Sequence, residues 1–432
     1  MRFTVIVTLT LLFSLSAVPL AAQPSEGLTL VGALNPHNAN YADLWGYTAP
    51  DDTEYALLCV SGQGLSIIDI SGATPVEVGF VDGLGDSFDV KVYGHHAYLS
   101  HNVGPIQIID LTDPSNPVQV ATHDALGPHN IAIAGDYLYT VGGDGAGGLR
   151  IYALNPDPMD PQLVGTYEPY YYHDVLVRGD TLYAAAILGQ GIDIIDLADR
   201  SNPSLIANFN YPGSGAHNIC STEDGSHVFI GDEIGSSGNW TRAFDVRDPE
   251  NATLVAELIV NPNAVVHNCY GKDDVIYIGH YDEGVRVWDA HDPENPVEIA
   301  YHESGGAWTV YPYFASGKFI ASDISDGLYV FELDAIVANE PTAPGAAFTL
   351  EAAYPNPFRT QTTLRFTLDT PSDARLTLYD ALGRAVAVLA AGAHEPGTHT
   401  ATFDGSHLPS GVYLARLTAE GRTATQRLTL LR

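Results

Sequence analysis

The chain of 432 residues is too long for one small domain, and its 45% hydrophobic content is enough to build a core. The formal net charge of −34 at pH 7 is strongly acidic. Because no basic stripe is available for a phosphate backbone, general nucleic-acid binding is excluded, and a solvated acidic surface is favoured.

Residues 1–22 are typical of a secretory signal peptide. Arg2 precedes an apolar stretch, and Leu20-Ala21-Ala22 offers a small-residue cleavage site before Gln23. The alternative is a transmembrane anchor, but Thr and Ser interrupt the run and no basic flank follows it. Since no other segment is apolar for long enough to span a bilayer, we expect no transmembrane segment in the mature chain.

Residues 23–334 carry a repeated unit made of an apolar strand, an Asp and a turn closed by proline. The copies recur at intervals of about 40–50 residues, which is typical of a four-stranded propeller blade. The close copies are Pro105–Pro117, Gly191–Pro203 and Gly284–Pro296, and the degenerate ones are Gly64–Ser71, Gly148–Pro161, Trp240–Thr253 and Gly327–Asp334.

The two ends of this array predict a closed ring. The last unit, Trp308–Asp334, stops after its third strand, whereas Leu28–Leu34 at the other end resembles a fourth strand without a blade. Placing this segment on the last unit removes an open sheet edge. We therefore predict an all-β fold, a seven-bladed β-propeller closed by the N-terminal strand.

The character of the sequence changes after residue 334. Residues 335–347 are rich in Pro, Ala and Gly and are typical of a linker. In residues 348–432, half-polar strands alternate with Gly and Pro turns, which predicts a small antiparallel β-sandwich.

The C-terminal segment resembles the sorting domain of the type IX secretion system over about residues 348–432. The matching stretches are Ala353–Phe358, Leu378–Arg384, Leu408–Leu417 and Arg427–Arg432. This resemblance implies passage across the outer membrane by the type IX export machinery. The sorting domain is then usually removed, and the protein is tethered to the cell surface or released. These residues would form an export signal rather than a catalytic site.

The repeats resemble the LVIVD-repeat propellers of the group called choice-of-anchor B proteins, over about residues 28–334. The motif stands here as Ile108-Ile109-Asp110, Ile194-Ile195-Asp196, Ile67-Ile68-Asp69 and Val287-Trp288-Asp289. The group shares a scaffold and varied surface anchors, and it has no agreed reaction. The resemblance therefore implies architecture and location but no mechanism.

A second motif appears when the units are aligned at their first strands. It stands as His129-Asn130, His173-Asp174, His217-Asn218 and His267-Asn268, with Ala42-Asp43, Phe88-Asp89 and Trp308-Thr309 in the same columns. In a propeller the first strand lines the central channel. We therefore expect these side chains at one channel mouth, together with loop carboxylates such as Asp232-Glu233.

Three interpretations of this mouth are open. Asn and Asp cap turns at strand starts and a repeated His bonds a neighbouring blade, which is a purely structural role. Neutral imidazoles also bind metals, and His173, His217 and Asp174 are the candidate ligands. Finally, the His side chains, Trp45, Trp308 and Tyr170–Tyr172 suit a polar ligand or glycan.

The three cysteines are too few for a disulfide framework. Cys220 follows Asn218 by two residues, whereas Cys269 follows Asn268 by one, so we expect them to face opposite sides of their strands. That arrangement argues against a bridge and predicts buried free thiols.

These observations favour a non-enzymatic binding scaffold at the cell surface or outside the cell, with a surface polymer, glycan or protein as its ligand. The alternative is a metal-dependent or hydrolytic enzyme at the His- and Asp-lined mouth. No catalytic residue can be named from the sequence. No cofactor is firmly implied, and a divalent metal is the one candidate.

Overall fold

The computed structural model describes residues 23–143, 147–236, 238–334 and 348–430, with short gaps in the last range at 351–352, 354–355, 357, 369, 381–383, 395–396 and 420–421. The signal peptide and the linker expected at 1–22 and 335–347 lie outside the described residues. The chain divides after Asp334 into two compact units.

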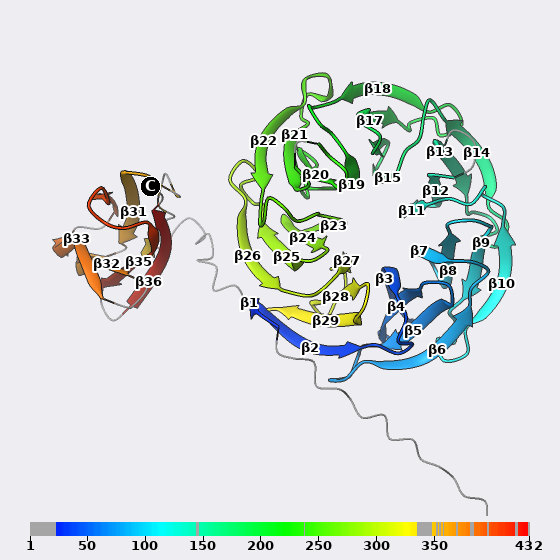
Figure 1. The fold of residues 1–432 in the computed structure, drawn as a ribbon, viewed down its shortest axis with the longest axis horizontal. Helices are drawn as coiled ribbons and strands as arrows, with labels where there is room; N and C mark the ends of the chain where they lie inside the picture. Colours follow the sequence, from blue (N-terminus) through cyan, green and yellow to red (C-terminus); the bar gives the residue numbers. More distant parts are fainter. Residues whose placement is uncertain are drawn as a thin grey trace, which may run out of the picture. The chain divides into compact units, whose positions relative to one another are not determined.

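The first unit is a propeller of seven antiparallel sheets arranged radially around a central channel (Figure 1). The prediction of seven blades is confirmed. Blade 1 comprises β3 (Tyr41–Thr48), β4 (Glu54–Val60), β5 (Gly64–Asp69) and β6 (Val76–Asp82), and blade 2 comprises β7 (Ser87–Tyr93), β8 (His96–His101), β9 (Ile106–Asp110) and β10 (Val118–His123). Blade 3 comprises β11 (Asn130–Ala134), β12 (Tyr137–Val141), β13 (Leu149–Ala153) and β14 (Gln162–Tyr167), and blade 4 comprises β15 (Asp174–Arg178), β16 (Thr181–Ala186), β17 (Gly191–Asp196) and β18 (Ser204–Phe209).

Blades 5 to 7 use the same order, except that the outer strand of blade 7 comes from the start of the chain. Blade 5 comprises β19 (Ala216–Ser221), β20 (His227–Asp232), β21 (Thr241–Asp245) and β22 (Thr253–Leu258). Blade 6 comprises β23 (Cys269–Lys272), β24 (Val275–His280), β25 (Gly284–Asp289) and β26 (Val297–His302). Blade 7 comprises β27 (Ala307–Tyr311), β28 (Lys318–Asp323), β29 (Gly327–Leu333) and β2 (Leu28–Leu34). The first strand of each blade lies next to the channel.

The sequence repeat forms the third strand of each blade and the turn that follows it. In the copy at Pro105–Pro117, Asp110 accepts a hydrogen bond from the backbone N–H of Thr112 at 2.7 Å. Asp113 accepts one from the backbone N–H of Ser115 at 3.1 Å. The turn is therefore built by side-chain acceptors and a proline that presets φ, as the sequence predicts.

The N-terminal strand closes the ring as predicted. β2 pairs antiparallel with β29, from Leu28 opposite Leu333 to Leu34 opposite Leu328. It carries a register shift between Leu30 and Gly32, and the outer strands of the other blades carry one as well. β2 therefore has both the position and the register shift of the fourth strand of a blade.

The same segment also reaches blade 6, which the sequence did not indicate. β1 (Ser25–Glu26) pairs with β26, placing Ser25 opposite His302 and Glu26 opposite Tyr301. Gly27 connects β1 to β2 with a φ of 70°, a conformation that favours glycine. The beginning of the described chain therefore joins two neighbouring blades, as Figure 1 shows in blue beside yellow and green strands.

The second unit is the predicted β-sandwich. A sheet of β30 (Phe348–Leu350), β31 (Gln361–Leu368) and β34 (Gly397–Asp404) faces a sheet of β33 (Ala385–His394), β32 (Ser372–Asp380), β35 (Gly411–Ala419) and β36 (Arg422–Leu430). Leu364, Phe366 and Leu376 belong to the single core between them. Alternate residues of β31 are buried and exposed, which is the pattern of a strand with one solvated face.

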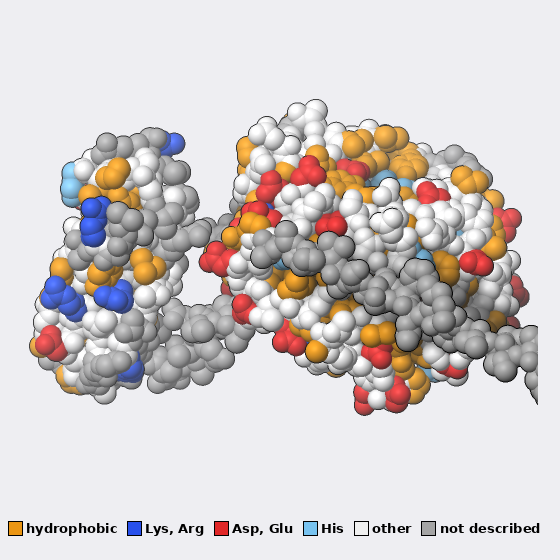
Figure 2. Space-filling model, turned by 60° about the horizontal axis from the view of Figure 1, so that its bottom comes forward, with side chains coloured by type: hydrophobic (Ala, Val, Ile, Leu, Met, Phe, Trp, Pro, Cys, Tyr) orange, Lys and Arg blue, Asp and Glu red, His pale blue; other side chains and the backbone are white. Residues whose placement is uncertain are grey.

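The surface agrees with the composition. Figure 2 shows acidic side chains spread over the visible face of the propeller and basic side chains on the second unit. Only one helix, the single 3-10 turn Pro249–Asn251, occurs in the described part of the chain. Among those residues, no helix is long and apolar enough to cross a membrane.

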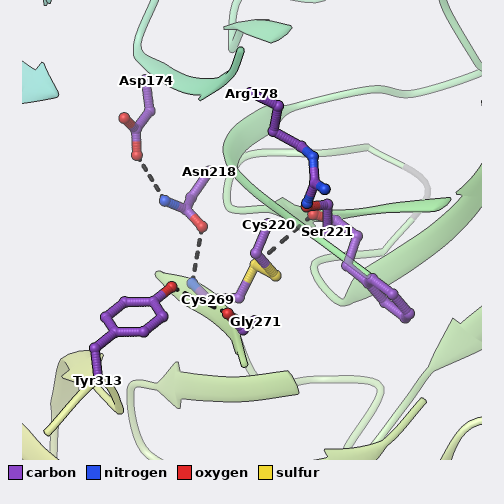
Figure 3. Close-up of a disulfide and its surroundings, with 9 residues drawn as sticks. Asp174, Arg178, Asn218, Cys220, Ser221, Cys269, Gly271 and Tyr313 are labelled. Carbon is purple, nitrogen blue, oxygen red and sulfur yellow. Dashed lines mark hydrogen bonds between the residues drawn. A yellow bond between two sulfur atoms is a disulfide. The ribbon is translucent and has the colours of Figure 1, made fainter. Parts of the chain in front are cut away.

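The cysteine prediction was wrong, because Cys220 and Cys269 form a disulfide with their Cα atoms 5.7 Å apart. The two residues do lie on opposite faces of their strands, as expected. However, neighbouring blades pack with opposite faces toward each other, so this arrangement brings the two sulfurs together between blades 5 and 6 (Figure 3). Cys59 in blade 1 is a buried free thiol.

We predict that denatured but unreduced protein exposes one reactive thiol, and that reduction exposes three. Since the bridge closes a loop across 49 residues of sequence, the C220A/C269A variant should lose about 2–4 kcal/mol of unfolding free energy. Alkylation followed by mass spectrometry gives the thiol count, and denaturant titration gives the stability. Three thiols reacting without reductant would contradict the bridge.

Candidate functional site

Six aromatic side chains form a closed ring at the channel mouth where the first strands begin, which we call the upper mouth. The members are Phe88, His129, His173, His217, His267 and Trp308. Successive ring centroids from Phe88 to Trp308 are 4.2–4.4 Å apart, and Trp308 lies 5.5 Å from Phe88. Blade 1 contributes Ala42 in this column, and its small side chain leaves room for the contact between Trp308 and Phe88.

The four histidines of this ring are neutral. Burial lowers the pKa of His173 to about 2 and that of His267 to about 3, and it lowers the pKa of His217 well below its usual value. Burial also lowers the pKa of His129. At His173, His217 and His267 the other imidazoles of the ring add to the effect, because a proton on one imidazole would repel a proton on another. A stack of neutral rings is therefore the stable form.

Three of the four histidines make different polar contacts. The Nδ1 atom of His267 lies 2.7 Å from the backbone oxygen of Trp308, and that of His129 lies 3.1 Å from the side-chain oxygen of Asn102. The Nδ1 atom of His173 lies 3.2 Å from the hydroxyl of Tyr171. The Nε2 atom of His173 and the Nδ1 atom of His217 are buried without a hydrogen-bond partner among the described residues.

Glu233 lies beside two of these imidazoles. One ligand atom each from His173, His217 and Glu233 lie within 4.8 Å of one another. The Nε2 atom of His217 is 3.6 Å from the Oε2 atom of Glu233, which is too long for a hydrogen bond. Since His217 is neutral, this contact is not an ion pair either. The other carboxylate oxygen of Glu233 accepts a hydrogen bond of 2.8 Å from the Tyr281 hydroxyl.

The column of Asp and Asn residues next to the aromatic ring joins neighbouring blades. The side chain of Asn130 donates to the backbone oxygen of His173 at 2.8 Å. Asn218 donates to Asp174 at 2.6 Å and accepts from the backbone N–H of Cys269 at 2.8 Å, as Figure 3 shows. Asn268 donates to Thr309 at 3.4 Å. These contacts tie neighbouring blades to one another at this column.

Asp174, the third candidate metal ligand beside His173 and His217, accepts a hydrogen bond from Asn218. Burial raises its pKa to about 6. The carboxylate that does lie beside the two imidazoles is Glu233, at the end of the second strand of blade 5. Sequence reasoning grouped Asp232 and Glu233 only as loop carboxylates, because the conformation of that loop is not encoded in the repeat.

Blades 1 and 2 share a buried charge cluster that the sequence did not reveal. Lys91 donates to Asp43 at 3.2 Å and also to Asp89, and Asp89 accepts from the backbone N–H of Ile131 in blade 3 at 2.8 Å. Burial raises the pKa of Asp43 well above its usual value, whereas Lys91 helps to lower that of Asp89. The ammonium group also lies 4.6 Å from the centre of the Trp45 ring.

A cavity of about 330 Å³ occupies the channel between this polar layer and the ends of the first strands, which form the lower mouth. Its polar lining includes Lys91, Asp174, Asn218 and Arg178. The lining also contains three aromatic residues: Trp45, Tyr270 and Tyr313. The Trp45 ring lies 5.6 Å from that of Tyr270 and 6.4 Å from that of Tyr313.

Hydrogen bonds between neighbouring blades lie at the lower mouth. Arg178 of blade 4 donates to the Ser221 hydroxyl at 2.6 Å and to the backbone oxygen of Thr222 at 2.7 Å. The Tyr313 hydroxyl donates to the backbone oxygen of Gly271 at 3.1 Å, while the residue as a whole stays 41% exposed. Arg178, Tyr270 and Tyr313 belong to no repeated motif, so sequence reasoning missed them.

Comparisons with known proteins agree with this architecture. Residues 352–430 match the secretion system C-terminal sorting domain. Residues 53–82, 84–124 and 171–211 match the LVIVD repeat. The chain therefore contains an LVIVD-repeat region and a C-terminal sorting domain, and the sorting domain directs it by type IX secretion to the cell surface or the extracellular space. A search of curated proteins finds no match.

Two solved structures show the same kind of fold. PorZ, a surface component of the type IX secretion system of Porphyromonas gingivalis, is 13% identical with a TM-score of 0.51 over 92% of this chain and 60% of PorZ. This chain thus corresponds to about 60% of the PorZ length. A chain of the mitotic checkpoint complex is 11% identical with a TM-score of 0.54, over 75% of this chain and 99% of that one. At these identities the likeness concerns the fold alone.

We predict that Lys91→Met destabilises the protein by about 3–5 kcal/mol, because it leaves the buried carboxyl groups of Asp43 and Asp89 without their cation. This loss of stability should become smaller as the pH falls. In the variant no cation offsets burial, so burial raises the pKa values of both carboxyl groups and acid neutralises them by protonation. Denaturant unfolding at neutral and acidic pH measures this effect.

Lys272→Met is the matched control. Among the described residues, Lys272 donates only to the backbone oxygens of Pro312 and Phe314, at 3.0 and 3.4 Å. Its replacement should cost about 1 kcal/mol, with little dependence on pH in the acidic range. Equal losses in the two variants would show that the cluster around Lys91 has no special role.

Proposed function

We propose that this secreted or surface-located propeller is a non-enzymatic binding protein, and that it takes the end of a glycan or surface polymer into the cavity at the lower mouth. The observation that carries the proposal is the lining of that cavity. Aromatic rings offer faces for a sugar ring, while amide, carboxylate and guanidinium groups offer hydrogen bonds to its hydroxyls.

The chemistry of the lining favours a neutral or weakly charged polar ligand. Lys91 already neutralises carboxylates beside it, and Arg178 is engaged by backbone and hydroxyl oxygens. A strongly anionic polymer would also meet the repulsion of a chain with net charge −34. A glycan or an uncharged polymer end fits these constraints better than a polyanion.

The placement of such a protein at the cell surface suits the choice-of-anchor B resemblance, in which one scaffold is combined with different anchors. The sorting domain supplies export, and the propeller supplies binding. A metal-dependent or hydrolytic enzyme at the upper mouth is the alternative. It is disfavoured because His173 and His217 are 8% and 2% exposed, so a substrate has little access to them.

A glycan array followed by calorimetric titration of the hits tests this proposal. Tyr313→Ala removes an exposed ring from the lower mouth, so we expect at least a tenfold loss of affinity, in line with about 1–3 kcal/mol for an aromatic contact. Arg178→Gln should also weaken binding. Arg247→Gln is the matched control, because Arg247 pairs with Asp245 on an exposed turn outside the cavity.

Binding that survives both cavity variants would place the ligand elsewhere on the protein. Absence of any binding together with turnover of a substrate would overturn the proposal in favour of an enzyme.

A further inference from the structure

We propose that His173, His217 and Glu233 form a binding site for a single first-row transition-metal ion of the zinc type at the upper mouth. The three side chains come from neighbouring blades 4 and 5, and one ligand atom of each lies within 4.8 Å of the others. Metal–nitrogen and metal–oxygen bonds are about 2.0–2.2 Å long, so small side-chain rotations bring all three onto one ion. This site does not depend on the function proposed for the lower mouth.

A buried nitrogen is the first independent observation in its favour. The Nε2 atom of His173 has no hydrogen-bond partner among the described residues, although the residue is more than nine-tenths buried. An unpaired buried polar atom is costly, and a metal ion would satisfy this nitrogen directly.

The supporting contacts are the second observation. Tyr281 donates to one oxygen of Glu233 and leaves the other, Oε2, beside His217. The Tyr171 hydroxyl lies 3.2 Å from the Nδ1 atom of His173. Partners of this kind orient metal ligands and set their affinity. In contrast, a direct hydrogen bond to His217 does not explain the position of this oxygen, because it lies 3.6 Å from the Nε2 atom of His217.

The donor set selects the metal. Two imidazoles and one carboxylate suit Zn²⁺ and its first-row neighbours, whereas Ca²⁺ and Mg²⁺ prefer oxygen ligands alone. Three protein ligands leave one coordination position, and the low exposure of the histidines gives that position little access to bulk solvent. We therefore infer a site that holds blades 4 and 5 together rather than one that turns over a substrate.

The test is a metal titration of the purified full chain after chelator treatment. Zn²⁺ affinity is measured by competition with a chromophoric chelator, and Co²⁺ is used as a spectroscopic probe. We expect one equivalent bound far more tightly than the rest, with Co²⁺ giving the visible absorption of a four-coordinate site containing nitrogen. The melting temperature should rise on addition of Zn²⁺.

Two variants and one control separate this site from the acidic surface. Glu233→Gln keeps the size of the side chain and should weaken the tight equivalent by more than about tenfold, while Tyr281→Phe should weaken it less. Glu303→Gln makes the same charge change at an exposed position and should leave it unchanged. Weak binding of many ions, equal in wild type and Glu233→Gln, would overturn the proposal and show adventitious binding by surface carboxylates.

Discussion

The structure depends on the pairing of an N-terminal strand, β2, with the last propeller strand, β29. Without this pairing blade 7 has three strands and an open edge, and nothing covalent joins it to blade 1 except the whole length of the chain. β2 repeats the register shift of the other outer strands. Gly32 in this strand also lies where a side chain would meet Pro75 of blade 1, so the closing strand fits its neighbour as well as its partner.

Closure of the ring is what creates the channel and its two different ends. The aromatic ring at the upper mouth takes one residue from each of six blades, so its stacking exists only while the blades stay in a circle. The Asp and Asn column then ties blade to blade beneath it. Below that layer lies the cavity, which is wide enough for a small polar group. The upper mouth is therefore filled by stacked rings, whereas the cavity lies toward the lower mouth.

Much of this organisation could be predicted from the sequence, because the same residue pattern occurs seven times and each copy forms an equivalent blade. The Asp turns, the number of blades and the role of Leu28–Leu34 follow from it, and so does the gathering of the four histidines. The disulfide was missed because facing surfaces of neighbouring blades are opposite faces of equivalent strands. Glu233, Lys91 and Arg178 were missed for another reason: each occupies a position that the other units do not share, and only the folded backbone brings it to the channel.

The measurement that tests this account most directly is hydrogen exchange of the whole chain compared with a form that lacks residues 23–34. The truncated form should lose protection in β28 and β29, and also in β3 of blade 1, where the backbone N–H of Tyr41 donates to the backbone oxygen of Ile324. Protection should persist in blades 3 and 4, far from the junction. Unchanged protection in β29 and β3 would show that the ring is held closed by something other than its N-terminal strand.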